Sequence, residues 1–151
     1  MRRALRRPDR AGRNERLGGE PVILLDTHAW LWWLSDPNHL SPRARETIDT
    51  ASTSGGVAVS TISTWEAALL VRKSRLELRL PVRDLASACA QLPFFRFIAV
   101  DVEIAIASVE LDGLHADPAD RLILATARHA GLDLITRDER LQASPGIRTI
   151  W

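Results

Sequence analysis

From residue 22 onward, short apolar runs alternate with longer amphipathic stretches, and this alternation limits the chain to very few folds. The pattern is typical of parallel strands joined by helical crossovers, so we expect an α/β fold with a mainly parallel sheet. The runs predicted to form strands are 22–26, 56–60, 96–100, 132–136 and 148–151. The stretches predicted to form helices lie near 27–35, 42–53, 62–74, 81–91, 101–112 and 117–130.

The boundaries of these elements carry residues that commonly begin and end helices. Ser41 and Asp117 each stand directly before a proline, which matches a helix N-cap followed by proline at the first helical position. Gly131 follows the last long amphipathic stretch and is expected to end that helix. With 151 residues and 46% hydrophobic content the chain can build one core, and we assign residues 21–151 to one domain.

Residues 1–20 differ in composition from the rest of the chain. They contain seven arginines and three acids, so this segment carries about +4 and the remainder about −3. Because it has few large apolar side chains to bury, we expect a disordered basic tail. The interpretations that stay open are a start codon placed too far upstream, a passive tail, and a nonspecific contact with RNA or DNA.

Composition argues against a membrane protein and against a secreted one. No run reaches the roughly 18 apolar residues of a membrane span, and the arginine-rich start lacks the apolar stretch of a secretory signal. The single Cys89 has no partner for a disulfide or a zinc site, and the four histidines show no metal-binding spacing. We therefore expect a cytoplasmic protein with no membrane partner.

Four carboxylates stand beside the expected carboxyl ends of strands. Asp26 closes the first apolar run, and Glu66 lies one turn into the helix after the second run. Asp120 opens the last long helix, and Asp138 follows the strand after it. Ligands of open parallel sheets bind outside the carboxyl ends of the strands, near the point where strand order reverses. We therefore expect the four acids to converge at one edge of the sheet.

Each acid also has a structural explanation when it is taken alone. Ser63 and Glu66 have the spacing of a capping box, Asp117 fits an N-cap, and acids in a first turn suit the helix dipole. A second box is conceivable over residues 136–139. Asp26 is harder to explain as a cap, because a serine or threonine would cap the next helix without burying a charge.

Taken together, the acids favour a functional site. Like charges crowded into one pocket repel one another and raise their pKa values unless a cation balances them. Mg²⁺ and Mn²⁺ are the natural cations, since they prefer carboxylate and water oxygens and are commonly completed by a substrate phosphate. The chemistry indicated is phosphodiester hydrolysis by a water molecule that the metal activates.

The four acids lie in motifs that resemble a known family. "LLDTHAWLWW", "STISTWEAAL", "DPADRLILATA" and "LITRDERL", in this order, resemble a PIN-domain ribonuclease and, more narrowly, the VapC toxin of a type II toxin-antitoxin pair. The resemblance runs from Val22 to the end of the chain. It implies a three-layer α/β/α PIN domain with four to five strands, and Mg²⁺- or Mn²⁺-dependent endonucleolytic cleavage of RNA. It also implies neutralisation by a small VapB-type antitoxin that binds DNA.

The resemblance assigns roles to individual residues. Those expected to be catalytic and to hold the metal are Asp26, Glu66, Asp120 and Asp138. Those expected to support the site or contact substrate are Thr27, Asp117, Arg121 and Thr136. For Asp117 we favour capping over metal contact, and for Arg121 a phosphate contact and a salt bridge are equally open. The basic tail departs from the family, and Asp138 stands where some relatives have asparagine.

The helix expected over 27–35 is apolar around nearly its whole circumference. It contains Trp30, Trp32 and Trp33, and core packing explains two of them more readily than three. We therefore expect the tryptophans to contribute to a homodimer contact or to an antitoxin groove.

Two other functions remain open at this stage. One is a PIN nuclease of RNA processing that has no antitoxin. The other is a catalytically silent PIN-like interaction module, in which the acids only cap helices and the tryptophan-rich helix and basic tail bind partners. The silent module predicts no affinity for metal.

Overall fold

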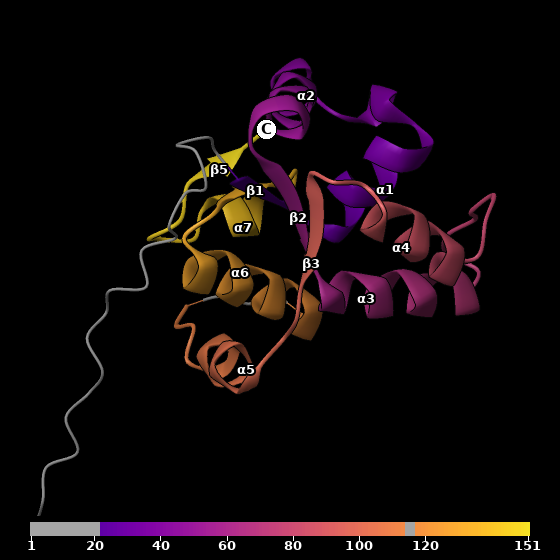
Figure 1. Ribbon diagram of the computed structural model, residues 1–151. Helices are drawn as coiled ribbons and strands as arrows, with labels where there is room; N and C mark the ends of the chain where they lie inside the picture. The colour runs from indigo at the N-terminus through magenta and orange to yellow at the C-terminus, as the bar shows by residue number, and fades with distance from the viewer. Residues whose placement is uncertain (1–21, 114–116) are drawn as a thin grey trace, which may run out of the picture.

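The computed structural model describes residues 22–113 and 117–151 (Figure 1). The tail expected over 1–20 lies outside these residues. In chain order the elements are β1 (Val22–Leu25), α1 (Thr27–Ser35), the 3₁₀ helix η1 (Pro37–His39), α2 (Pro42–Ser54), β2 (Gly56–Ser60), α3 (Thr61–Arg72), α4 (Val82–Ala90), β3 (Phe95–Ile98), α5 (Val102–Val109), α6 (Pro118–Ala130), β4 (Asp133–Ile135), α7 (Glu139–Gln142) and β5 (Thr149–Ile150).

The strands form one sheet in the order β3-β2-β1-β4-β5, and every pairing in it is parallel. The five predicted strands are confirmed, and their ends differ from the predicted ones by at most two residues. From β1 the chain builds β2 and β3 on one side, then returns to place β4 and β5 on the other. Strand order therefore reverses between β1 and β4, which is where open parallel sheets bind ligands.

Alternating side chains of the strands face two separate hydrophobic clusters. Ile23 and Leu25 of β1 pack with residues of α1, α2 and α4, whereas Leu24 packs with residues of α5, α6 and α7. Figure 1 shows α2 above the sheet and α5 and α6 below it. This is the expected three-layer α/β/α arrangement, and it buries β1 and β2 on both faces. No helix in the described part of the chain is long and apolar enough to cross a membrane.

Several predicted helix ends are confirmed. The hydroxyl of Ser41 accepts a hydrogen bond from the Ala44 amide at 3.0 Å, and Asp117 accepts one from the Asp120 amide at 2.9 Å. Gly131 ends α6 with φ 66°, a left-handed conformation that favours glycine.

The capping box considered as an alternative explanation of Ser63 and Glu66 is wrong. Helix α3 begins at Thr61 with Ser60 as its N-cap, so Ser63 and Glu66 already lie inside the helix. Two short helices, η1 and α7, were not predicted, because a single turn is too short to show a hydrophobic period.

Candidate active site

Asp26 lies at the point where strand order reverses. Leu25 of β1 is aligned with Ile135 of β4, so the next residues, Asp26 and Thr136, are neighbours at the carboxyl edge of the sheet. The Asp26 amide donates to the Ile135 carbonyl at 3.1 Å, and its carboxylate caps α1 by accepting from the Ala29 amide at 2.7 Å. The side chain is only 6% exposed. Burial raises the pKa of Asp26, while hydrogen bonds from Thr136 and Ala29 oppose that shift.

Thr136 connects two of the predicted acids. Its hydroxyl hydrogen-bonds the Asp26 carboxylate and also accepts from the Asp138 amide at 3.1 Å. The residue is fully buried. Thr136 therefore holds Asp26 and fixes the start of the turn that carries Asp138, which agrees with a supporting role.

Glu66 reaches the same edge from α3. The Thr27 hydroxyl donates to its carboxylate at 2.5 Å and lies 3.0 Å from the hydroxyl of Ser63. Thr27 follows Asp26 directly and is buried, so this hydrogen bond ties the second acid to the turn that carries the first. Ser63 was not singled out as a contact of Thr27 in the sequence, because its spacing to Glu66 suggested a cap.

The pKa of Asp120 is raised by the negative charges of the other predicted acids. It opens α6, and its side chain is 17% exposed. The pKa of Asp120 is raised to about 7, first by burial and then by the negative charges of Asp117, Glu66, Asp138 and Asp26. This coupling indicates that the four predicted acids share one electrostatic environment.

Asp138 is the N-cap of α7 and is held by a residue that the sequence did not single out. The guanidinium of Arg140 contacts both carboxylate oxygens of Asp138, at 2.9 and 3.3 Å, and approaches the Asp120 carboxylate at 3.8 Å. Hydrogen bonding from Arg140 lowers the pKa of Asp138. A cation two residues after Asp138 in "LITRDERL" was the available signal for this contact.

The residues at this edge fit a divalent cation of the Mg²⁺ class. Within the described residues, no group of three or more Asp, Glu, His or Cys side chains forms a cage that could hold a metal ion. Mg²⁺ seldom requires such a cage, since it binds through one or two carboxylates and keeps waters that a phosphate can replace. The raised pKa of Asp120 marks a surplus of negative charge that a cation would balance.

Arg121 makes structural contacts. Its guanidinium donates to the carbonyls of Ser108, Val109 and Leu111 at 2.8 to 3.0 Å, and so satisfies the end of α5. Asp117 likewise acts as the N-cap of α6. These contacts provide a structural reason for both residues. A direct contact with substrate stays a prediction.

The three tryptophans of α1 differ in their surroundings. Trp30 is 0% exposed, so its own surface belongs to the core. Trp32 stacks on His39 and also contacts Trp151, while Trp33 stacks on Phe95. Trp32 and Trp33 are half-buried and stay candidates for a partner contact. The most exposed tryptophan in the described residues is Trp65 of α3, at 54%.

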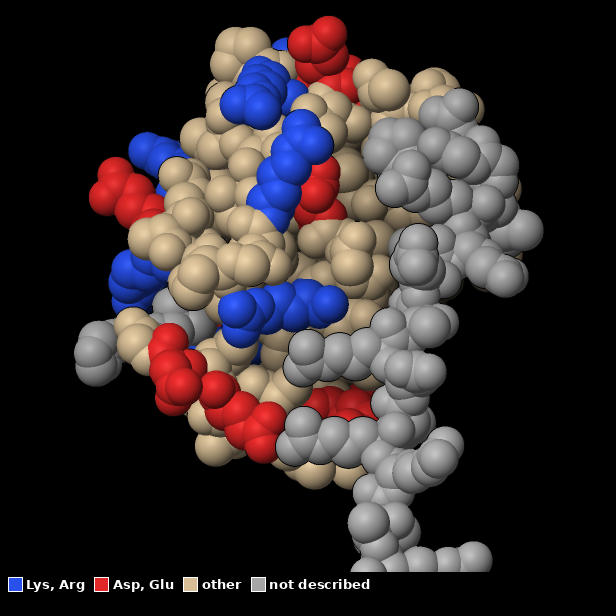
Figure 2. All heavy atoms as spheres, turned by 90° about the vertical axis from the view of Figure 1, so that its left-hand side faces the viewer, with Lys and Arg blue, Asp and Glu red and all other residues tan. Residues whose placement is uncertain are grey.

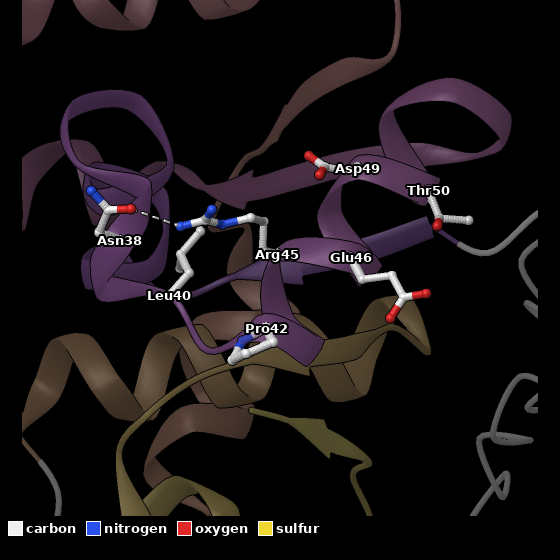
Figure 3. A pocket seen from close by; sticks show the side chains of 7 residues that line it. All are labelled: Asn38, Leu40, Pro42, Arg45, Glu46, Asp49 and Thr50. Carbon is white, nitrogen blue, oxygen red and sulfur yellow. Dashed lines mark hydrogen bonds between the residues drawn. The ribbon is translucent and has the colours of Figure 1, made fainter.

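A shallow hollow of about 560 Å³ lies elsewhere, beside η1 and α2 (Figure 3). It is lined by Asn38, Leu40, Pro42, Arg45, Glu46, Asp49 and Thr50. Arg45 is hydrogen-bonded to Asn38 across it, and none of the four predicted acids reaches it. We therefore assign the candidate active site to the carboxylates. On the face that Figure 2 shows, basic and acidic side chains are mixed, without a single basic surface.

The crowding of acids predicts a dependence of stability on pH. Because the pKa of Asp120 is about 7 in the folded chain and 3.8 as a free side chain, stability falls as pH rises between these values. We expect Asp120→Asn to raise the free energy of unfolding above pH 7 by about 1–3 kcal/mol, and to have little effect near pH 4. Urea denaturation in EDTA at both pH values measures this. An equal difference at both would contradict the shift.

Comparison with known proteins gives consistent results. Residues 23–146 match the PIN domain family. The chain is 36% identical over 133 residues to Ribonuclease VapC22 of Mycobacterium tuberculosis, covering 86% of this chain and 98% of that protein.

Two solved structures show a similar fold. One is a toxin-antitoxin complex from Klebsiella pneumoniae, with a TM-score of 0.57 and 25% identity over 83% of this chain and 94% of that chain. The other is VapBC2 from Rickettsia felis bound to a promoter DNA fragment, with a TM-score of 0.63 and 16% identity over 85% and 96% of the respective chains.

Proposed function

Because the chain belongs to the PIN-domain family, we propose that it is a VapC-type endoribonuclease, the toxin of a toxin-antitoxin pair, which hydrolyses RNA with Mg²⁺ or Mn²⁺. The observation that carries this proposal is the convergence of Asp26, Glu66, Asp120 and Asp138 where strand order reverses. The similarity to a ribonuclease over most of the chain supports the nuclease activity.

The residues proposed to hold the cation are the four acids themselves, which present oxygen ligands from four separate segments. When bound, a divalent cation would supply polarisation of the scissile phosphate and activation of a water molecule. Asp26, which is 6% exposed, would contribute a buried carboxylate, and charge acts most strongly where water is excluded. Thr27 and Thr136 orient Glu66 and Asp26 through hydroxyl hydrogen bonds, so they act as positioning residues.

The proposed partners are an RNA substrate, a small VapB-type antitoxin and a second copy of the chain. Solved neighbours that are toxin-antitoxin complexes support the antitoxin. The half-buried Trp32 and Trp33 offer apolar surface to such a partner. We also propose that the protein acts in the cytoplasm, where its RNA substrates would be found.

Cleavage of RNA by the purified protein tests this proposal. Total RNA is incubated with the protein freed from its antitoxin, with Mg²⁺ or Mn²⁺ added, and with EDTA as the control. We expect discrete fragments with either ion and none with EDTA, since crowded carboxylates cannot by themselves stabilise a phosphorane-like transition state. Fragments that form equally in EDTA would contradict the use of metal. A folded protein that cuts no RNA under any condition would favour the silent interaction module.

A further inference from the structure

Arg140 occupies the position where a cation would meet the acids. Its guanidinium contacts both oxygens of Asp138 and lies 3.8 Å from Asp120. These two acids come from different segments, one before α7 and one in α6. The arginine therefore partly neutralises the same two carboxylates that are proposed to bind a divalent ion.

The exposure of Arg140 allows its guanidinium to leave Asp138 and Asp120. The Arg140 side chain is 58% exposed, whereas those of Asp138 and Asp120 are 27% and 17% exposed. A long exposed side chain can turn into solvent, while the Asp138 carboxylate stays in place as the N-cap of α7. The Arg140 amide also donates to Asp138 at 2.8 Å, so the carboxylate keeps its orientation when the guanidinium leaves.

We propose that Arg140 is a built-in competitor of the divalent cation, which must leave Asp138 and Asp120 before the ion can bind them. The competition follows from geometry and charge, because the guanidinium covers both oxygens of Asp138, lies 3.8 Å from Asp120, and supplies the positive charge that a metal ion would otherwise bring. This inference rests on the proposed use of a divalent cation. It adds a residue that sets how tightly the ion binds.

Binding of Mn²⁺ to the full-length chain, measured by calorimetry, tests the role of Arg140. We expect Arg140→Ala to bind Mn²⁺ about threefold to tenfold more tightly than the unchanged protein, because the competitor is gone and the site is more negative. In EDTA the same variant should unfold at a lower temperature, since Asp120 and Asp138 lose their counter-charge. The two readouts therefore move in opposite directions, which simple damage to the fold would not produce.

Arg148→Ala is the matched control. Arg148 is 67% exposed and pairs with Asp133 at 3.4 Å, away from the four acids, so its loss should leave Mn²⁺ affinity unchanged. Equal and measurable dissociation constants for Arg140→Ala and the unchanged protein would overturn the role of Arg140 alone. If neither protein bound Mn²⁺, the proposed use of metal would be overturned, and this inference with it.

Discussion

Replacing Asp26 with asparagine is expected to lower RNA cleavage by at least about 100-fold, since loss of a metal-binding carboxylate removes several kcal/mol of transition-state stabilisation. The fold should survive. Asparagine keeps an oxygen that can accept from the Ala29 amide, and its neutral amide avoids burying a charge at a position that is 6% exposed. Cleavage rates and thermal unfolding of the same preparation separate the two effects.

Asp36→Asn is a suitable control for that experiment. Asp36 also caps a helical segment, by accepting from the Asn38 amide at 3.2 Å, but it lies on the surface beside His39. Its replacement should leave cleavage unchanged. If Asp26→Asn cut RNA at the normal rate, the nuclease activity would belong to a contaminant or to another site.

The largest loss of stability is expected from Trp30→Ala. Trp30 is 0% exposed and packs edge-on against Phe97, with ring centroids 5.9 Å apart, in the cluster between the sheet and α1. Truncation of a buried tryptophan costs about 3–5 kcal/mol, which is a large part of the stability of an ordinary domain. Urea denaturation followed by circular dichroism measures the change without relying on tryptophan fluorescence.

Trp65→Ala tests whether this loss comes from burial. Trp65 is 54% exposed on α3, and we expect its truncation to change the free energy of unfolding by less than about 0.5 kcal/mol. Similar losses for both variants would mean that Trp30 contributes no more to the core than a surface residue does.

The fold was largely predictable from the sequence, because the strands are buried on both faces and so appear as continuous apolar runs. The sequence also predicted the edge of the sheet at which Asp26, Glu66 and Asp120 lie, because parallel strands place their carboxyl ends together. The separate roles of the acids did not follow. Asp26 caps α1 and is also buried where strand order reverses. Each of these two roles places an acid at the same turn, so the sequence could not separate them.

Contacts that depend on the folded structure could not be predicted from sequence patterns. Trp32 is covered in part by His39 and by Trp151, the last residue of the chain, so its burial depends on the folded structure. Arg140 was missed because α7 has four residues, too few to show which face meets Asp138. Ser60 was missed as a cap because it ends a buried strand and begins a helix without any intervening loop.

The parallel register between β1 and β4 sets the distance between two residues of the proposed site. Neighbouring strands lie about 4.8 Å apart, and Leu25 is paired with Ile135, so Asp26 and Thr136 are spaced by the backbone itself. A slip of β4 by one residue would turn Thr136 to the other face and bring an aliphatic or an arginine side chain beside Asp26. A single residue added within β4 should therefore move Thr136 away from Asp26 and break the link that its hydroxyl makes between Asp26 and Asp138.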